Sequence, residues 1–302
     1  MELRELRYFL AVAQEQSITK AANYLYISQP SLSKQMQNLE KEVGRPLFVR
    51  GSRKIALTET GVLLKKRAEE MIALYEKTEA EISAPPEDVA GEVLIGGGES
   101  CAVRTVAQAA CAVQREYPSV RFRLFSGDAD EMMERLDKGL IDFCIVVDLE
   151  RLPDYSKYSA LRLPYADTWG VLMRRDSALA AKERIAADDL RGVPILTSLQ
   201  SLRKGSRLLE WFGGDVKGLN ICGKFNLIYN ASLLVKAGMG YAIALDHLVN
   251  TTGESVFCFR PLDPPLHTPL DIVWKKYTVF SRPAQIFLDQ LQKTIAEQTT
   301  QP

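Results

Sequence analysis

The feature that most constrains this 302-residue chain is a pair of short helical patterns close together near its amino terminus. Apolar residues recur every three or four positions over residues 18–25 and again over residues 32–43, a spacing that places side chains on one helix face. Ser28 suits the cap of the second helix, Pro30 its first turn and Gly44 the position past its end. Only residues 26–28 lie between Leu25 and Gln29, a connection of the length that predicts a helix-turn-helix.

The outer face of the second predicted helix is rich in hydroxyl, amide and lysine side chains. Such groups donate to phosphates and base edges, and an amide can pair with adenine through two hydrogen bonds. A recognition helix that presents its first turn to the DNA major groove needs this kind of surface. An ordinary solvated helix face has the same composition, so composition alone leaves both interpretations open. The residues are Gln29, Ser31, Ser33, Lys34, Gln37, Asn38 and Lys41.

The segments on either side complete a small domain. Residues 3–13 carry another apolar helical stripe, and residues 48–50 and 54–57 predict two short strands joined by a tight turn. This hairpin would form a wing. Arg50 and Arg53 lie on it or beside its tip, where they could reach phosphates or a minor groove. Surface charge without a function is the alternative.

Charge is distributed unevenly along the chain. The net charge is +0, but residues 1–58 hold nine Lys and Arg against five Asp and Glu. The basic surplus coincides with the predicted helix-turn-helix, which favours a polyanionic partner for that part alone. A surplus of this modest size fits a domain that binds duplex DNA as one half of a dimer.

Residues 59–83 predict a single long helix with a coiled-coil seam. The apolar positions alternate at four and three residues, and the helix is too long for a small winged domain to bury. It therefore calls for a partner helix, although Thr78 interrupts the pattern. The seam consists of Leu64, Ala68, Met71, Tyr75, Thr78 and Ile82.

The pattern changes after two prolines in residues 83–92, a composition typical of a hinge. Short apolar strands then alternate with helices, which predicts α/β subdomains with parallel sheets that bind ligands at the carboxyl ends of their strands. The expected strands are residues 92–97, 120–125, 142–147 and 169–173, and the expected helices are 103–117, 130–139 and 228–238.

Length and composition limit the class of protein. A chain of this length accommodates two or three domains, and its lack of a long apolar run predicts a cytoplasmic protein without a membrane partner. The five cysteines are scattered and lack a C-x-x-C spacing, which predicts neither a disulfide framework nor a zinc site. With only two histidines, we expect no metal and no other cofactor.

The amino-terminal third carries a set of short motifs that together identify a family. They are the Ala-Ala pair at 21–22, Ser-Gln-Pro-Ser-Leu-Ser at 28–33, Leu-Glu at 39–40 before Gly44, Leu-Phe-x-Arg at 47–50 and Leu-Thr-x-x-Gly at 57–61. The chain resembles LysR-type transcriptional regulators through these motifs, and its second half agrees with the family in the order of its segments. The resemblance favours DNA binding over a merely solvated helix face.

This resemblance implies a multidomain fold: an all-α, winged helix-turn-helix domain, a long linker helix and an α/β, two-lobed effector domain like a periplasmic binding protein. It implies a dimer, assembled as a dimer of dimers, that binds double-stranded promoter or operator DNA and contacts RNA polymerase. The implied ranges are 1–58 for DNA binding, 59–89 for the dimerising linker and hinge, and 90–302 for the effector domain, with lobe 1 at 90–162 and 266–302 and lobe 2 at 163–265.

The family's recognition turn and wing can be carried over residue by residue. Gln29 is the first choice for a base contact, Pro30 would set helix geometry and touch backbone or a thymine methyl, and Lys34 would act electrostatically with the wing arginines. The implied DNA-binding residues are Ser28, Gln29, Pro30, Ser31, Ser33, Lys34, Arg50 and Arg53.

The family's effector cleft corresponds to five loops, residues 98–101, 126–128, 147–149, 197–198 and 225–230. Hydroxyls at strand ends, together with helix-terminal N–H groups, suit a carboxylate, so we expect an anionic metabolite. Any one hydroxyl could instead be a simple cap, and Asp128 leaves room for a ligand with a positive or hydroxylated end. The expected effector residues are Ser100, Cys101, Ser126, Thr197, Ser198, Phe225 and Asn230.

Three other functions compete with an effector-controlled regulator. Cys101 precedes a predicted helix, whose amino terminus can lower the pKa of a thiol, but no sequence feature places His247 or His267 beside it, so we do not expect an enzyme. A redox-sensing regulator would use Cys101 or Cys222. A regulator that needs no small effector is the third alternative.

Overall fold

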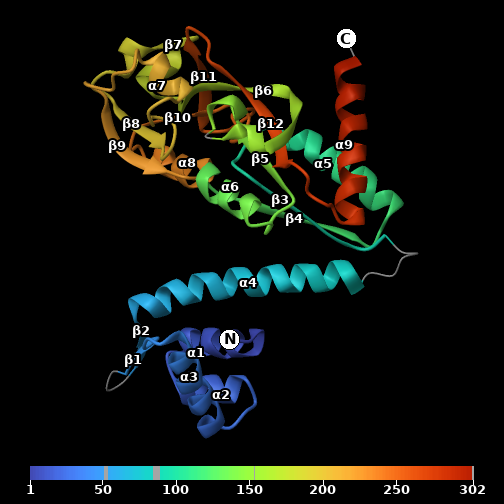
Figure 1. The fold of residues 1–302 in the computed structure, drawn as a ribbon. Helices are drawn as coiled ribbons and strands as arrows, with labels where there is room; N and C mark the ends of the chain where they lie inside the picture. Colours follow the sequence, from blue (N-terminus) through green and yellow to red (C-terminus); the bar gives the residue numbers. More distant parts are fainter. Residues whose placement is uncertain (51–53, 84–88, 153, 301–302) are drawn as a thin grey trace. The chain divides into compact units, whose positions relative to one another are not determined.

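The computed structural model describes residues 1–50, 54–83, 89–152 and 154–300. It divides into two compact units, residues 1–84 and 85–302, whose elements are labelled in Figure 1. None of the described helices is both long enough and apolar enough to cross a membrane.

The first unit is a winged helix-turn-helix. Helices α1, α2 and α3 enclose a core that includes Phe9, Leu32 and Leu39, and β1 pairs antiparallel with β2. This confirms the expected helix-turn-helix and hairpin. The elements are α1 (Leu3–Glu15), α2 (Ile18–Tyr24), α3 (Gln29–Val43), β1 (Phe48–Arg50) and β2 (Ile55–Leu57).

Local chemistry sets the ends of α3 and ties it to the wing. The Ser28 hydroxyl accepts a hydrogen bond from the Ser31 N–H at 3.4 Å, and Gly44 ends the helix in the left-handed conformation. The Glu40 carboxylate accepts from the N–H groups of Leu47 at 2.7 Å and Phe48 at 3.2 Å. The Leu-Glu motif thus holds the start of β1 against the recognition helix.

Helix α4 (Glu59–Ser83) confirms the predicted long helix. It packs on α1, where Ala68 is completely buried. An ion pair joins the two helices, with 3.2 Å between Arg7 Nη2 and Glu76 Oε1. Beyond Ala68 the described residues cover the seam only in part: Arg7 lies over the Tyr75 ring, 5.9 Å from its centroid, yet Tyr75 is 40% and Ile82 79% exposed. The first unit therefore buries only the beginning of the predicted seam.

The second unit is built on one mixed sheet of ten strands. Its main order is β4-β3-β5-β12-β6-β10-β8-β9, with β11 beside β6 and β7 beside β11. The neighbours β4-β3-β5 and β10-β8-β9 are parallel as expected, whereas β12 and β6 are antiparallel to their partners. The strands are β3 (Gly91–Gly97), β4 (Val120–Ser126), β5 (Phe143–Val147), β6 (Tyr158–Arg174), β7 (Ile185–Ala186), β8 (Pro194–Ser198), β9 (Asn220–Phe225), β10 (Tyr241–Leu245), β11 (Phe257–Asp263) and β12 (His267–Lys275).

Helices pack on the part of the sheet that pairs with the first half of β6 and also on the part that pairs with its second half. The three helices expected here, α5, α6 and α8, are confirmed within a few residues. The α-helices are α5 (Val103–Glu116), α6 (Ala129–Asp137), α7 (Arg207–Trp211), α8 (Ile228–Lys236) and α9 (Arg282–Thr300), and the 3-10 turns are Leu149–Arg151, Tyr155–Lys157, Ala178–Ala181 and Ala187–Leu190.

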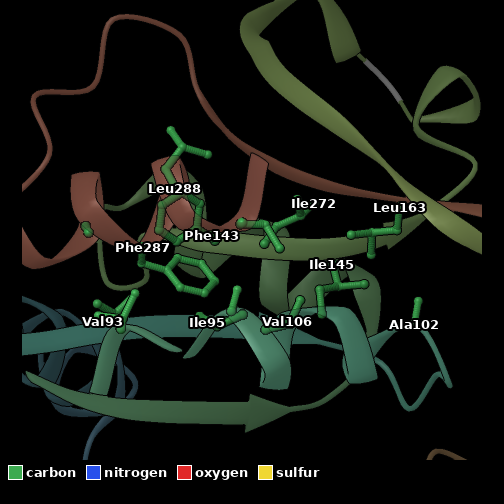
Figure 2. Packing of buried hydrophobic residues seen from close by; sticks show 14 of the residues in the cluster. Val93, Ile95, Ala102, Val106, Phe143, Ile145, Leu163, Ile272, Phe287 and Leu288 are labelled. Atoms are coloured by element: carbon green, nitrogen blue, oxygen red, sulfur yellow. The ribbon is translucent and has the colours of Figure 1, made fainter. Parts of the chain in front are cut away.

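Strand β6 connects two lobes. Residues 158–168 pair with β12, and residues 169–174 pair with β10 and β11. The first lobe comprises β3, β4, β5 and β12 with α5, α6 and α9, and its core includes Phe143 and Phe287, whose ring centroids are 5.3 Å apart (Figure 2). The second lobe comprises β7 to β11 with α7 and α8. Leu163 still packs in the first core, whereas Trp169 packs against the second, so β6 changes lobes between them.

Candidate functional site

The first turn of α3 is open to solvent. Leu32, Met36 and Leu39 bury one face of the helix, which turns the opposite face outward. Lys34 is exposed and forms no ion pair with any described residue. This is the geometry that a helix needs to enter a major groove. Of the predicted residues here, Ser33 is half-buried and the others are exposed, namely Ser28, Gln29, Pro30, Ser31 and Lys34.

The wing is described only in part. Arg50 pairs with Ile55 through the backbone, which places the residue at the end of β1. The side chain of Arg50 and the whole of Arg53 lie outside what the structure describes. Their predicted contacts with phosphates therefore stay predictions.

A cavity of about 310 Å³ lies between the two lobes of the second unit. Its size falls in the range of small-molecule sites, and its wall combines apolar side chains with several charged and hydroxyl groups. The walls include Glu99, Asp128, Asp130, Ile145, Asp148 and Arg151 from the first lobe, Ser198, Gln200, Ser201, Arg207, Leu208, Phe225, Ile228 and Leu245 from the second, and Trp169 and Thr268 from the strands that connect them.

The seven predicted effector residues are distributed over different surroundings. Ser198 and Phe225 line the cavity. Thr197 is buried behind it, and its hydroxyl lies 2.6 Å from that of Ser201. Asn230 is exposed on α8 and is not part of the cavity wall.

The remaining predicted hydroxyls lie next to the cavity. Ser100 and Ser126 line a neighbouring hollow of about 260 Å³ that shares Glu99 with the main cavity. The Ser100 hydroxyl accepts from the Ala102 N–H at 3.0 Å and so stabilises a local turn before α5. The geometry therefore brings only part of the predicted set to one place.

Cys101 has an environment that suppresses thiolate formation. Its thiol donates to Oδ1 of the buried Asp167 at 2.9 Å, and its N–H donates to the same oxygen at 3.3 Å. Burial, followed by the hydrogen bond to Asp167, raises the pKa of Cys101 to about 12. A helix amino terminus can lower the pKa of a thiol, but burial and the Asp167 carboxylate outweigh that effect here. Because the thiolate is the reactive form, Cys101 is poorly suited to be a nucleophile or a redox sensor.

The cavity rim carries a charge network that no sequence motif indicates. Asp148 accepts from Arg207 Nε at 2.5 Å, and Arg151 donates to both oxygens of Glu210 at 2.7 and 2.8 Å. Asp148 lay in an expected cleft loop, at the end of β5. Its partner is 59 residues away in the sequence, so no local pattern connects them.

Glu99 occupies the amino terminus of α8 from across the cleft. Its carboxylate accepts from the N–H of Ile228 at 2.5 Å, and Ile228 is the first residue of that helix. A helix amino terminus attracts negative charge. The chain thus places its own carboxylate where a ligand anion was expected. In the described part of the chain, no group of His, Cys, Asp and Glu side chains is arranged to hold a metal ion.

Two family models match the chain. Residues 3–62 match the bacterial regulatory helix-turn-helix proteins of the lysR family, and residues 86–296 match the LysR substrate binding domain. The two matches correspond to the two units of the structure. Together they leave few residues of the chain unmatched.

Individual relatives agree with the family models. The Hca operon transcriptional activator HcaR of Escherichia coli is 33% identical over 285 residues, which cover 91% of this chain and 92% of HcaR. The regulator BsdA of Bacillus subtilis is 35% identical over 150 residues, about half of each protein.

Solved structures show the same fold. The crystal structure of the LysR family regulator CbnR matches with a TM-score of 0.76 at 20% identity, over 98% of this chain and 99% of CbnR. Full-length CbnR complexed with its target DNA matches with a TM-score of 0.73 at 20% identity, over 97% and 100% of the two chains. The chain belongs to the LysR family of transcriptional regulators, with a helix-turn-helix unit followed by the family's two-lobed substrate binding domain.

Proposed function

We propose that this protein is a sequence-specific regulator of transcription whose DNA binding is controlled by a small molecule in the cavity between the lobes. The observation that carries the proposal is the presence, in one chain, of an exposed recognition turn on α3 and a walled cavity of about 310 Å³. An effector would act by binding one arrangement of the subunits more tightly than another.

The working assembly is a dimer, and a dimer of dimers on promoter or operator DNA. The apolar seam of α4 supports this proposal, because Met71 and Tyr75 are each about two-fifths exposed in the single chain. A second α4 would cover them in a coiled coil. Contact with RNA polymerase is proposed for the bound assembly on the family resemblance alone.

Within the DNA-binding unit, base readout and phosphate contact fall to different residues. Gln29 would read a base edge with its amide, and Pro30 would pack against the backbone or a thymine methyl. Lys34, Arg50 and Arg53 would bind phosphates. The exposed hydroxyls of the same turn, Ser28 and Ser31, with the half-buried Ser33, would donate to the backbone.

The effector is proposed to be an anionic metabolite with an apolar body. Apolar walls such as Leu208 and Phe225 would hold the body, and the Ser198 hydroxyl with the Arg207 guanidinium would meet the anion. Asp128 and Glu99 also line the cavity, which favours an effector whose other end is positive or hydroxylated.

The first test is capture of genomic DNA by the purified full-length protein, with and without a metabolite extract. A small number of dyad-symmetric sites is expected, and the flanking genes name the pathway from which effectors are then screened. Absence of enriched sites under both conditions, from a folded dimer, contradicts the proposal. Enrichment that no metabolite changes supports the alternative of a regulator without a small effector.

Substitutions on α3 and the wing test the division of roles. Gln29→Ala is expected to cost about 1–3 kcal/mol on the cognate site and to relax base preference there. Arg53→Ala is expected to weaken binding to every sequence. It should also reduce, by about one unit, the slope of the logarithm of the binding constant against the logarithm of the salt concentration. Lys34→Ala is the matched variant on α3 itself and should behave like Arg53→Ala. Equal losses on all sequences for all three would contradict the roles proposed here.

A further inference from the structure

The two lobes are joined along one side of the cavity by ion pairs that all converge on one short segment of the second lobe. Residues 203–210 supply every second-lobe partner. First-lobe partners come from the start of α6 and from the turn after β5. The pairs are Asp148 with Arg207, Arg151 with Glu210, and Asp130 with Arg203.

Two of these pairs have the geometry of strong interactions. Arg151 meets Glu210 through two parallel hydrogen bonds and also donates to the Gly205 carbonyl at 2.6 Å. Asp148 is only 7% exposed, so water and salt screen its contact with Arg207 less than they screen a surface pair. Without Arg207, the nearest cation to Asp148 would be Arg151, at 3.9 Å. The third pair, between Asp130 and Arg203, is exposed and contributes little.

The segment that carries these partners is fixed to the second lobe. Leu208 is buried in that lobe's core, and the Ser206 hydroxyl donates to the Ser201 carbonyl at 2.6 Å. Breaking the ion pairs would therefore release a whole lobe rather than a loop. The lobes would remain connected by the hydrogen bond from the Ile228 N–H to Glu99 and through β6 and β12, the strands that could serve as a hinge.

We propose that these pairs form an inter-lobe latch, centred on Asp148–Arg207 and Arg151–Glu210, that holds the cavity closed before any effector binds. The effector enters when the latch opens, and ionic strength sets how often it opens. The proposal rests on the proposed function for the identity of the ligand site, but closure by the chain's own charges requires no ligand.

The fluorescence of Trp169 can report whether the cavity between the lobes is closed. Trp169 lines the cavity, and its indole N–H donates to the Thr268 hydroxyl at 2.7 Å. The chain has three tryptophans, so Trp211→Phe with Trp274→Phe in the full-length protein leaves Trp169 as the only one. Acrylamide quenching of its fluorescence then measures how far the cavity is open to solvent.

The latch variant is Arg151→Gln with Arg207→Gln in this single-tryptophan protein. Its acrylamide quenching constant is expected to be at least about twice that of the parent. The reason is that most molecules of the parent have a closed cavity, whereas most molecules of the variant have an open one. Potassium chloride at about 1 M, where the Debye length is near 3 Å, should move the parent part of the way to that value. The matched control is Arg191→Gln, which breaks an ion pair with Asp188 inside the second lobe. It should quench like the parent.

Equal quenching of parent and latch variant at low and high salt, with unchanged circular dichroism, overturns the latch. If the double variant does not fold, Glu210→Gln provides the same comparison, because it removes the exposed partner of Arg151 and leaves Asp148 paired. The experiment uses no effector. Failure to find one counts against the proposed function alone, and equal quenching counts against the latch alone.

Discussion

At the scale of single residues, Cys101 shows how its neighbours decide the chemistry of a side chain. The residue stands just before α5, a position that by itself favours a thiolate. Its thiol instead faces a buried carboxylate, and the second oxygen of Asp167 has no hydrogen-bond partner among the described groups. Burial and this carboxylate both favour the protonated thiol.

Asp167→Asn is therefore expected to make Cys101 more reactive. Removing the carboxylate removes one of the two main causes of the raised pKa, so the thiolate fraction at pH 8 should increase. Alkylation by iodoacetamide, followed by peptide mass spectrometry, measures the rate. The exposed Cys111 serves as the internal control, and its rate should be the same in both proteins. Unchanged Cys101 alkylation would show that burial alone holds the proton.

Buried thiols also predict a loss of stability at alkaline pH. Burial raises the pKa of Cys144 to about 12 from its ordinary value of 9.0. Below pH 9 the thiol is protonated in both states, whereas above it the unfolded chain loses the proton first, so the free energy of unfolding falls as pH rises. Urea unfolding between pH 8 and 10 should show a shallower decline for Cys144→Ala than for the wild type. Parallel curves would contradict this.

At the scale of elements, the start of α4 explains a glycine within the Leu-Thr-x-x-Gly motif. The Thr58 hydroxyl donates to the Pro46 carbonyl at 2.8 Å and accepts from the Gly61 N–H at 3.0 Å. A Cβ added at Gly61 would lie 2.1 Å from the carbonyl oxygen of Leu47. The motif is therefore a packing requirement between the wing and the long helix.

Gly61→Ala is expected to destabilise the first unit even though alanine is the better helix former. Forcing a methyl against the backbone costs about 1–3 kcal/mol, more than the roughly 1 kcal/mol gained in helix propensity. Thermal unfolding of the 1–84 fragment followed by circular dichroism measures the difference. Ala73→Gly, on the exposed surface of α4, is the control, because it measures the difference in helix propensity between alanine and glycine without a steric clash. A stabilised Gly61→Ala protein would contradict the close approach.

The second half of α4 carries the proposed dimer contact. Met71→Lys places a charge in the seam that a partner helix would cover, so we expect the dimer to weaken markedly, as measured by sedimentation equilibrium. Ala73→Lys introduces the same charge on the opposite face of α4, outside the seam, and should weaken the dimer less. Equal dissociation constants for the two variants would place the dimer contact elsewhere.

At the scale of the whole molecule, the chain consists of two units with separate cores. The first-unit core around Phe9 and the second-unit cores share no residue, and the described contacts of each core lie within its own unit. Fragments 1–84 and 89–302 are therefore expected to fold independently. Each should give a cooperative unfolding transition within a few degrees of the corresponding transition in the full chain. An unfolded 89–302 fragment would contradict this division.

Sequence alone determined the elements whose burial is decided by near neighbours. The spacing of apolar residues located α2, α3, the β1–β2 hairpin and α4, because side chains three, four or two positions apart share a face whatever the rest of the chain does. It also located the parallel strands β3, β4 and β5 as short apolar runs. The motif set around Gln29 was specific enough to name the family.

The lining of the cavity between the lobes follows from tertiary packing. Ser100 and Ser126 were expected to face it but line a neighbouring hollow, and Asn230 lies outside its wall. The charges that do line it, above all Asp148 with Arg207, meet only because β6 and β12 bring two lobes together. Periodicity reports the face of an element, whereas such a pair depends on which strands are neighbours. That is set by the packing of the whole sheet.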